Sequence, residues 1–299
     1  MKLAVIGTGY WGSKIVETAK GMGLPVTLYD INDSLDTIVP SLIDGVIIAT
    51  PASTHKDLTK IMLRKGINVL VEKPVFMNMA EYREIEPYTA KAKLMGGHIL
   101  LYNEHLDFLK QIIVDKDILH IEHRRLAWGR LQKDINPILH YAPHDIAVLD
   151  SILGVIPDTI QCKGIQVIKQ PQPDFVTCDL RYGKVTAQIQ MGWYYHEKVR
   201  DISVITNKGT LVWSDAKDTS RWISQSMENG RQIQHMDQNK TFSQSVPPLQ
   251  KQIAAFVDYC EKDKLPDSDM EHVKRITYIV ECMEKSLKTG EVVCPSKEF

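Results

Sequence analysis

Short apolar runs alternate with amphipathic segments in the first part of the chain. The runs have the length of buried strands, and the segments between them place apolar residues at helical spacing, as Ile15 and Ala19 show. The predicted strands cover residues 3–6, 26–29, 45–49, 68–71 and 94–97. Strands that alternate with helices in this way favour a parallel sheet with helices on both faces. Ligands of such a sheet bind beyond the carboxyl ends of its strands.

One connection in this region is too short for a complete doubly wound half. Only residues 31–45 separate Asp30 from Val46, which leaves no room for another full helix and strand. We therefore expect an abbreviated or missing edge strand after the second strand. Further along, Asn78 and Glu81 have the spacing of a capping box, and Pro87 should break or kink the helix that they begin.

From about residue 118, strand-like segments follow one another without helices between them. They cover residues 119–126, 159–168, 175–182, 184–194, 200–206 and 210–213. Residues 228–230, with the letters ENG, have the composition of a further hairpin turn. Apolar and polar residues alternate over 185–191, so one face should be buried while the other meets water or a partner subunit. We predict a large, mainly antiparallel open sheet.

Three helices complete the second half of the chain. One should begin at Pro143 and end at Gly154, and the others should cover residues 249–262 and 270–288. Together the patterns predict an α/β protein with a boundary between residues 117 and 118. Residues 1–117 should hold the parallel sheet, and residues 118–299 the open sheet with its helices.

The composition excludes some classes of partner. Of the 299 residues, 36 are basic and 37 acidic, and this net charge of −1 gives no basis for binding nucleic acid or an anionic membrane. No stretch is apolar enough to span a membrane and no secretory signal precedes the first strand, which favours a cytoplasmic protein. The 5 cysteines show no CxxC spacing and should be reduced thiols. A partner should be a small molecule or another copy of the chain.

The first two predicted strands frame the strongest motif. Gly7-x-Gly9-x-x-Gly12 follows the first strand and opens a helix, an arrangement that holds a pyrophosphate against backbone N–H groups. The second strand ends in Asp30, whose carboxylate suits the two hydroxyls of an adenosine ribose and would repel a 2′-phosphate. Glycines at this spacing can also mark only a flexible turn. Strand, helix and acid together favour dinucleotide binding, with NAD preferred to NADP.

Polar residues that follow the predicted strands should line one rim of the parallel sheet, and Glu72 there would hold the nicotinamide ribose. Residues 1–117 are therefore predicted to be a dinucleotide-binding Rossmann domain, and residues 118–299 a domain for substrate binding and oligomerisation. The candidate cofactor-binding residues are Gly7, Thr8, Gly9, Tyr10, Trp11, Gly12, Asp30, Thr50, Pro51, His55, Glu72 and Lys73.

Two residues could handle a proton beside a nicotinamide. Lys73 is either a solvated lysine at the end of a strand or, away from water and beside a cation, an ammonium that shares a proton with a substrate hydroxyl. His144 follows the proline that should begin a helix, where the helix dipole would keep its imidazole neutral and able to accept a proton. A packed, hydrogen-bonded histidine is the alternative. His140, four residues earlier, could face the same cleft.

Other polar clusters allow rival interpretations. The two histidines and Asp145 could ligate a metal, but no HExxH pattern or third assured ligand accompanies them, so no metal is predicted. Arg124, Arg125 and Arg130 surround Trp128 and could either clamp a phosphate or form the charged face of a strand and loop. No GxSxG elbow supports acyl transfer.

Several of these stretches together resemble one known family. In chain order they are VIGTGYWG, ATPASTH, VEKP, GGHILLYN and APHDIAVLDSILG. They resemble the glucose–fructose oxidoreductase / inositol dehydrogenase / MocA (Gfo/Idh/MocA) family of NAD(P)-dependent oxidoreductases over nearly the whole chain. The resemblance implies a Rossmann domain, a second domain with a large open sheet, and dimers or tetramers formed through that sheet. It also implies that Lys73 and His144 are the catalytic pair, with a cis bond before Pro74.

A closer resemblance is to one branch of that family. GGHILLYN, RRLAWGR and YAPHDIAVL look like the branch that includes nucleotide-sugar enzymes such as UDP-N-acetylglucosamine 3-dehydrogenase. In such an enzyme the arginines near Trp128 would be candidates for the diphosphate. Many relatives have an aspartate four residues before the catalytic histidine, where this chain has His140. The candidate substrate-binding residues are Asn103, Arg125, Trp128, Arg130, His140 and His144.

The expected function is hydride transfer between nicotinamide and a secondary alcohol or ketone of a sugar, with a nucleotide sugar as the expected substrate. His144 would act as acid or base, Lys73 would stabilise the developing alkoxide, and Asn103 would help to position the ligands. One alternative is a reductase or dehydrogenase of a keto-deoxysugar or a cyclic polyol. Another, from a different class, is a non-catalytic NAD-binding sensor or regulatory subunit.

Overall fold

The computed structural model divides the chain into two compact units. It describes residues 1–30, 32–129, 135–168, 172–228, 231–240 and 245–299. The first unit comprises Met1–Tyr102 and Val246–Tyr278, and the second comprises Asn103–Ser245 and Ile279–Phe299. This division differs from the single boundary predicted between residues 117 and 118, because a segment near the C-terminus packs with the first unit.

The first unit is built on a five-stranded sheet in the order β2-β1-β3-β4-β5. All of its strand pairs are parallel, as the alternation of strands and helices predicted. Every residue of β1 and β3 is buried, which explains why these strands are apolar throughout. The strands are β1 (Leu3–Ile6), β2 (Val26–Tyr29), β3 (Gly45–Ile48), β4 (Asn68–Glu72) and β5 (Leu94–Gly97).

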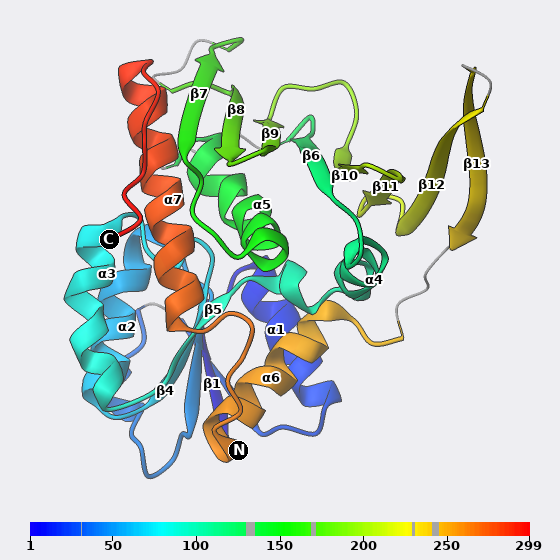
Figure 1. The fold of residues 1–299 in the computed structure, drawn as a ribbon. Helices are drawn as coiled ribbons and strands as arrows, with labels where there is room; N and C mark the ends of the chain where they lie inside the picture. Colours follow the sequence, from blue (N-terminus) through cyan, green and yellow to red (C-terminus); the bar gives the residue numbers. More distant parts are fainter. Residues whose placement is uncertain (31, 130–134, 169–171, 229–230, 241–244) are drawn as a thin grey trace. The chain divides into compact units, whose positions relative to one another are not determined.

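Helices cover both faces of this sheet. Figure 1 shows α2 and α3 on one side and α1 and α6 on the other. Lys93, the residue before β5, donates to the carbonyl oxygens of Tyr259 (2.6 Å) and Cys260 (3.3 Å). It therefore connects the C-terminal end of α6 to the sheet. The helices are α1 (Tyr10–Gly21), α2 (His55–Arg64), α3 (Met79–Ile85), α6 (Pro248–Lys262) and the first part of α7 (Met270–Thr289).

The edge of the sheet beyond β2 is abbreviated, as the short connection predicted. Between β2 and β3 the described residues form only a short 3₁₀ turn, Leu35–Thr37. The ammonium of Lys65, just after α2, donates to the carbonyl oxygens of Leu35 (2.6 Å) and Ile38 (3.1 Å). Lys65 thus holds this short segment in the place where a further helix and strand would otherwise pack.

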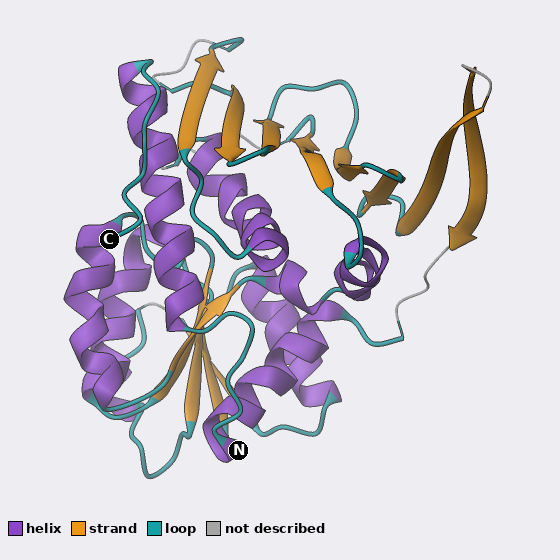
Figure 2. Cartoon of the chain, viewed as in Figure 1, coloured by secondary structure: helices purple, strands orange, loops and turns teal. Residues whose placement is uncertain are grey.

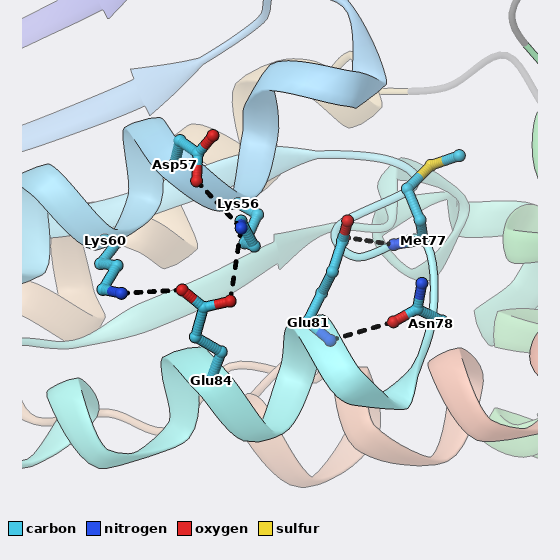
Figure 3. A network of polar contacts seen from close by, with 7 residues as sticks. All are labelled: Lys56, Asp57, Lys60, Met77, Asn78, Glu81 and Glu84. Atoms are coloured by element: carbon cyan, nitrogen blue, oxygen red, sulfur yellow. Dashed lines mark hydrogen bonds and ion pairs between the residues drawn. The ribbon is translucent and has the colours of Figure 1, made fainter.

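The predicted capping box begins α3 (Figure 3). Asn78 Oδ1 accepts a hydrogen bond from the backbone N–H of Glu81 at 3.0 Å, and the Glu81 carboxylate accepts one from the N–H of Met77 at 2.8 Å. The helix ends at Ile85, and a 3₁₀ turn with Pro87 in its first turn follows, as the proline predicted.

An ion-pair cluster joins α3 to α2. The carboxylate of Glu84 lies 2.7 Å from the Lys60 ammonium and 3.3 Å from that of Lys56, and Figure 3 shows the two lysines on α2 facing the glutamate on α3. These side chains are partly exposed, so each ion pair contributes at most about 1 kcal/mol to stability.

The second unit is built on an eight-stranded sheet in the order β13-β12-β11-β10-β6-β9-β8-β7. Its pairs are antiparallel except that β6 runs parallel to β9. The turn predicted at 228–230 falls between β12 and β13, and residues 229–230 lie outside the described part of the chain. The strands are β6 (Ile118–Leu126), β7 (Thr159–Ile165), β8 (Phe175–Tyr182), β9 (Val185–Gly192), β10 (Val199–Thr206), β11 (Gly209–Ser214), β12 (Thr219–Glu228) and β13 (Arg231–Lys240).

Two helices pack on this sheet, and the second part of α7 also belongs to the unit. Figure 2 shows the long helix α5 (Pro137–Leu153) against the strands; α4 (Glu104–Ile113), which the sequence patterns did not predict, packs on β11 and β12. The predicted start of α5 at Pro143 is wrong. Asn136 is the N-cap, its Oδ1 accepting from the N–H of Leu139 at 3.1 Å, and Pro143 lies inside the helix. In the described residues, no helix is both long and apolar enough to cross a bilayer.

Candidate active site

The glycine loop joins β1 to α1 with very little space. Gly7 has φ +121°, and a Cβ placed on it would lie 2.5 Å from the carbonyl oxygen of Ala49, just after β3. A Cβ on Gly12 would lie 1.9 Å from the carbonyl oxygen of Gly7. Gly9, the N-cap of α1, has nothing within 4 Å of its Cβ direction. The loop is therefore closed toward the sheet and open at Gly9, where a pyrophosphate can approach the helix N-terminus.

Asp30 lies beyond β2, beside this loop, because β1 and β2 are parallel neighbours. Its carboxylate accepts a hydrogen bond from Thr8 Oγ1 at 2.7 Å, and from the backbone and side-chain nitrogens of Asn32 at 3.1 Å and 2.9 Å. These donors hold the acid in place at the edge of the sheet. The role of Asp30 in binding the adenosine ribose stays a prediction.

His55 supports the loops after β3 and β4 and has no exposed nitrogen to offer. The residue is 1% exposed, and its two ring nitrogens lie 2.8 Å from the Pro74 carbonyl oxygen and 2.9 Å from that of Thr50. The structure thus gives it a bridging role in place of the direct cofactor contact predicted from sequence. Burial lowers the pKa of His55, and the nearby charge of Lys73 acts in the same direction, while the two carbonyl contacts oppose the shift.

Glu72 ends β4 as a buried carboxylate that is 8% exposed. One of its oxygens accepts from the backbone N–H of Lys73 at 3.3 Å. The other, Oε1, is buried without a hydrogen bond of good geometry, and so is the Nε1 of Trp11, whose indole lies close enough to act on the carboxyl. Burial raises the pKa of Glu72, and the Trp11 indole and the Lys73 charge oppose this rise. A ribose hydroxyl would give Oε1 the missing donor. Together with the open approach at Gly9, this fits a dinucleotide cofactor.

Lys73 is half-buried directly after Glu72, and its peptide bond to Pro74 is cis, as the resemblance implied. Because the strands of the first sheet are parallel, Lys73 lies at the same edge as the glycine loop, Asp30 and Thr50. An ammonium at this edge can stabilise an oxygen that becomes negative during a reaction.

His140 and His144 lie one turn apart on α5 in the second unit, and both are half-buried. The helix begins before both of them, so His144 does not lie in the first turn. The dipole argument for a neutral His144 therefore no longer applies, because that effect falls off within the first turn. The ring of His140 contacts those of Tyr141 and Trp193, with centroids 4.4 Å and 5.9 Å apart.

Arg124 and Arg125 lie on opposite faces of β6. Arg125 is 7% exposed, and its Nε donates to Asp145 Oδ1 at 2.9 Å, so it packs inside the unit and is not placed to clamp a diphosphate. Arg124, on the opposite face of β6, donates to the hydroxyl of Tyr195 at 3.2 Å. Arg130 lies outside the described residues. The alternation of β6 could have revealed the burial of Arg125, which shares a face with the fully buried Ile121.

Trp128 remains an exposed candidate for contacting substrate. It is 71% exposed, and its ring lies 4.9 Å, centroid to centroid, from that of Tyr194, which is 40% exposed. Sequence reasoning missed Tyr194 and Trp193. A signal was available, because both residues directly follow β9, whose carboxyl end lies beside that of its parallel neighbour β6.

Asn103 has a structural task. It is the N-cap of α4, its Oδ1 accepts from the N–H of His105 at 2.9 Å, and the residue is 2% exposed. This contact explains the residue without a ligand, and the predicted role in substrate binding stays a prediction.

A Ser–His–Asp arrangement also occurs in the second unit. The ring of His105 lies 2.7 Å from Ser220 Oγ and 2.8 Å from Asp218 Oδ1. Ser220 is 0% exposed, while the Asp218 side chain is 55% exposed. A catalytic triad needs the opposite, an accessible serine and a buried aspartate. These contacts connect α4 to β12 and offer no nucleophile.

Comparison with known proteins places this architecture. Residues 23–97 match the family described as "Oxidoreductase family, NAD-binding Rossmann fold" (GFO_IDH_MocA), and the fold of nearly the whole chain matches solved structures of such oxidoreductases. The chain thus resembles the Gfo/Idh/MocA oxidoreductases in fold, and residues 23–97 match their family model. The matched residues lie in the first unit, which carries the parallel sheet, and the second unit carries the large sheet.

Individual relatives of this chain are distant. An uncharacterized oxidoreductase of Streptococcus pneumoniae is 26% identical over 71% of this chain and 68% of its own length. UDP-N-acetylglucosamine 3-dehydrogenase of Acidithiobacillus ferrooxidans is 22% identical over 56% of this chain and 59% of its own length. A solved structure of that enzyme covers 97% of this chain and 98% of its own, with a TM-score of 0.85 and 17% identity.

A third likeness is to a structure that includes a cofactor. An oxidoreductase of Agrobacterium radiobacter, solved with NAD+, L-tartaric acid and magnesium, has a TM-score of 0.78 at 12% identity and covers 98% of both chains. At these identities the solved structures establish the shared fold alone.

The buried His55 gives a testable dependence of stability on pH. Because its pKa is lowered in the folded chain, the unfolded chain binds more protons, and the stability that neutral His55 provides is lost as the pH falls below about 6.5. His55→Gln should weaken the pH dependence of the free energy of unfolding between about pH 7 and pH 5, by at most about 1.4 kcal/mol per pH unit. Urea unfolding measures this.

A control variant removes an exposed imidazole and leaves the buried contacts of His55 in place. The side chain of His196 is 75% exposed, and His196→Gln should keep the pH dependence of the original chain. Equal pH dependence in the His55→Gln variant and the original chain would show that His55 is not held neutral by burial.

Proposed function

We propose that this chain is a Gfo/Idh/MocA oxidoreductase that uses NAD to transfer a hydride to or from a secondary carbinol carbon of a sugar, and that the sugar is part of a nucleotide sugar. The observation that carries the proposal is the placement of Lys73 beside the buried Glu72 at the carboxyl end of β4, on the edge where the glycine loop is open. That edge combines a place for a dinucleotide with a cation able to act on an alcohol.

The cofactor would be held by residues of the first unit alone. The backbone around Gly9 would bind the diphosphate, Asp30 the adenosine ribose and Glu72 Oε1 the nicotinamide ribose. NAD, when bound, supplies the carbon that accepts the hydride. The carboxylate of Asp30 disfavours a 2′-phosphate through like charge, which supports NAD over NADP.

Two side chains would handle the alcohol. His144 would accept the hydroxyl proton as the hydride leaves, and would return it in the reverse direction. The Lys73 ammonium would stabilise the negative charge on the oxygen as the proton moves. Both residues are half-buried, so water competes less strongly for them than at an open surface.

Two features support a nucleotide sugar as the substrate. The fold matches that of a UDP-N-acetylglucosamine 3-dehydrogenase over 97% of this chain. Trp128 and Tyr194 also offer exposed aromatic faces, on which a sugar or a base can stack. We further propose that copies of the chain assemble through the large sheet, whose face opposite α5 carries the polar side chains of β6.

The first test measures reduction of NAD by absorbance in the presence of a panel of UDP-sugars, free sugars and cyclic polyols. The proposal expects turnover with at least one UDP-sugar and little with the corresponding free sugar. Turnover only with cyclic polyols would replace the substrate class. Binding of NAD with no turnover across the panel would favour a sensor or regulatory subunit.

Replacing the proposed cationic group tests the chemistry. Lys73→Met should lower kcat at least about 100-fold while the Kd for NAD changes little, because Met keeps the volume of the side chain but removes its charge. Lys60→Met removes an ammonium of the same unit that contacts Glu84, and should leave kcat unchanged. Turnover retained in Lys73→Met would remove Lys73 from the mechanism.

Cofactor preference tests Asp30. Asp30→Ala should raise the Kd for NAD roughly 10- to 100-fold, as expected for hydrogen bonds to a charged group, and should affect NADP less. The matched control is Asp36→Ala, which removes an exposed acid from the same abbreviated segment. Equal losses for NAD and NADP would argue against contact between Asp30 and the ribose.

A further inference from the structure

A buried ionic cluster joins the strand β6 to the helix α5. Arg125 Nε donates to Asp145 Oδ1 at 2.9 Å, and His123 Nδ1 lies 3.3 Å from the same oxygen. All three residues are buried: Arg125 is 7% exposed, and Asp145 and His123 are each 1% exposed. The cluster lies wholly within the second unit.

This cluster forms because the strand alternates. His123 and Arg125 are two residues apart on β6 and therefore point to the same face, toward α5. Burial alone would raise the pKa of the Asp145 carboxyl, but Arg125 and His123 outweigh it and the pKa is lowered. The negative charge of Asp145 is thus stabilised by two residues that both come from β6.

Most of the other buried residues of α5 are apolar. Ile138, Ala142, Ile146 and Leu149 are all 0% exposed and apolar, and apolar contacts tolerate small rotations and shifts of a helix. An ion pair with a hydrogen bond at 2.9 Å does not, because a displaced carboxylate would leave two buried charges without compensation. The cluster therefore restricts the rotation of α5 about its axis.

His144 is the residue directly before Asp145. Successive residues of a helix differ by about 100° in direction, so fixing Asp145 toward the sheet also fixes the direction in which His144 leaves the helix. A catalytic base needs this accuracy, since a misplacement of about 1 Å can lower the rate on the order of 100-fold.

We propose that Arg125 and Asp145 are positioning residues for His144, the ion pair between them setting the orientation of the imidazole. The inference rests on the proposed function for the chemical role of His144, while the geometry of the cluster stands independently of it. It also assigns a task to Arg125 that the sequence had linked to the substrate diphosphate.

The main variant must remove the pair without leaving a buried charge. Asp145→Asn alone would strand the guanidinium and could unfold the unit, so the test uses Arg125→Met with Asp145→Asn in the full chain. This double replacement removes both charges and approximately keeps the volumes. The matched control is Asp218→Asn, which removes a carboxylate from another buried imidazole of the same unit, that of His105.

Two measurements are compared for the original chain, the double variant and the control. One is steady-state kinetics, with kcat separated from KM for NAD. The other is the NMR signal of the His144 imidazole, identified by its loss in His144→Gln, which reports the orientation and surroundings of the ring without turnover. Thermal unfolding monitored by circular dichroism checks that each variant is folded.

We expect the folded double variant to lose about 10- to 100-fold in kcat with an unchanged KM for NAD, and its His144 signal to move. The Asp218→Asn control should change neither. An unchanged His144 signal in the folded double variant would overturn the inference, and so would an unchanged kcat. If the original chain turns over no substrate, the proposed function fails, whereas the NMR signal still decides the positioning role.

Discussion

The contact between the backbones of Gly7 and Gly12 is the constraint on which the first unit depends. A side chain at Gly12 would lie 1.9 Å from the Gly7 carbonyl oxygen, and one at Gly7 would lie 2.5 Å from that of Ala49. The start of α1 is therefore pressed against the ends of β1 and β3. In the sheet, β2 lies on one side of β1 and β3 on the other, so the strand order reverses between β1 and β3. Open parallel sheets bind ligands at such a point. Close packing on the sheet side leaves Gly9 open, so the same contact shapes both the fold and the candidate cofactor site.

In the second unit, the parallel pair of β6 and β9 has a comparable role. In an antiparallel pair the two carboxyl ends would lie at opposite edges of the sheet, but here they lie at the same edge. The backbone contacts continue past the strands, with the N–H of Gly129 donating to the Trp193 carbonyl oxygen at 3.1 Å. This brings the segments with Trp128 and Tyr194 side by side. The neighbouring α5 contributes His140, whose ring contacts Trp193. One departure from antiparallel pairing thus gathers the exposed aromatic residues and a candidate histidine.

Local signals predicted those features that local physics determines. The five apolar runs became the parallel sheet, the short connection after Asp30 became an abbreviated edge, and Asn78 with Glu81 became a capping box. The wrong predictions concern features that a short stretch of sequence does not determine. Pro143 has the local signature of a first turn, yet Asn136 and Pro137 provide another start earlier in the chain. The packing of α6 with the first sheet depends on contacts between distant segments, including that of Lys93 with Tyr259.

Two buried carboxylates, Glu72 and Asp145, differ in whether the protein itself stabilises their charge. Glu72 and Asp145 are both buried, yet the pKa of Glu72 is raised and that of Asp145 is lowered. The difference lies in the cations: Arg125 donates directly to Asp145, whereas Glu72 has one backbone donor and an oxygen without a hydrogen bond of good geometry. Asp145 is therefore already stabilised as a carboxylate by its own unit. Glu72 is not, and a hydroxyl donor at its Oε1 would favour the charged form. A ligand hydroxyl at Glu72 Oε1 would thus link binding to the ionisation of Glu72, whereas the charge of Asp145 is an internal property of the fold.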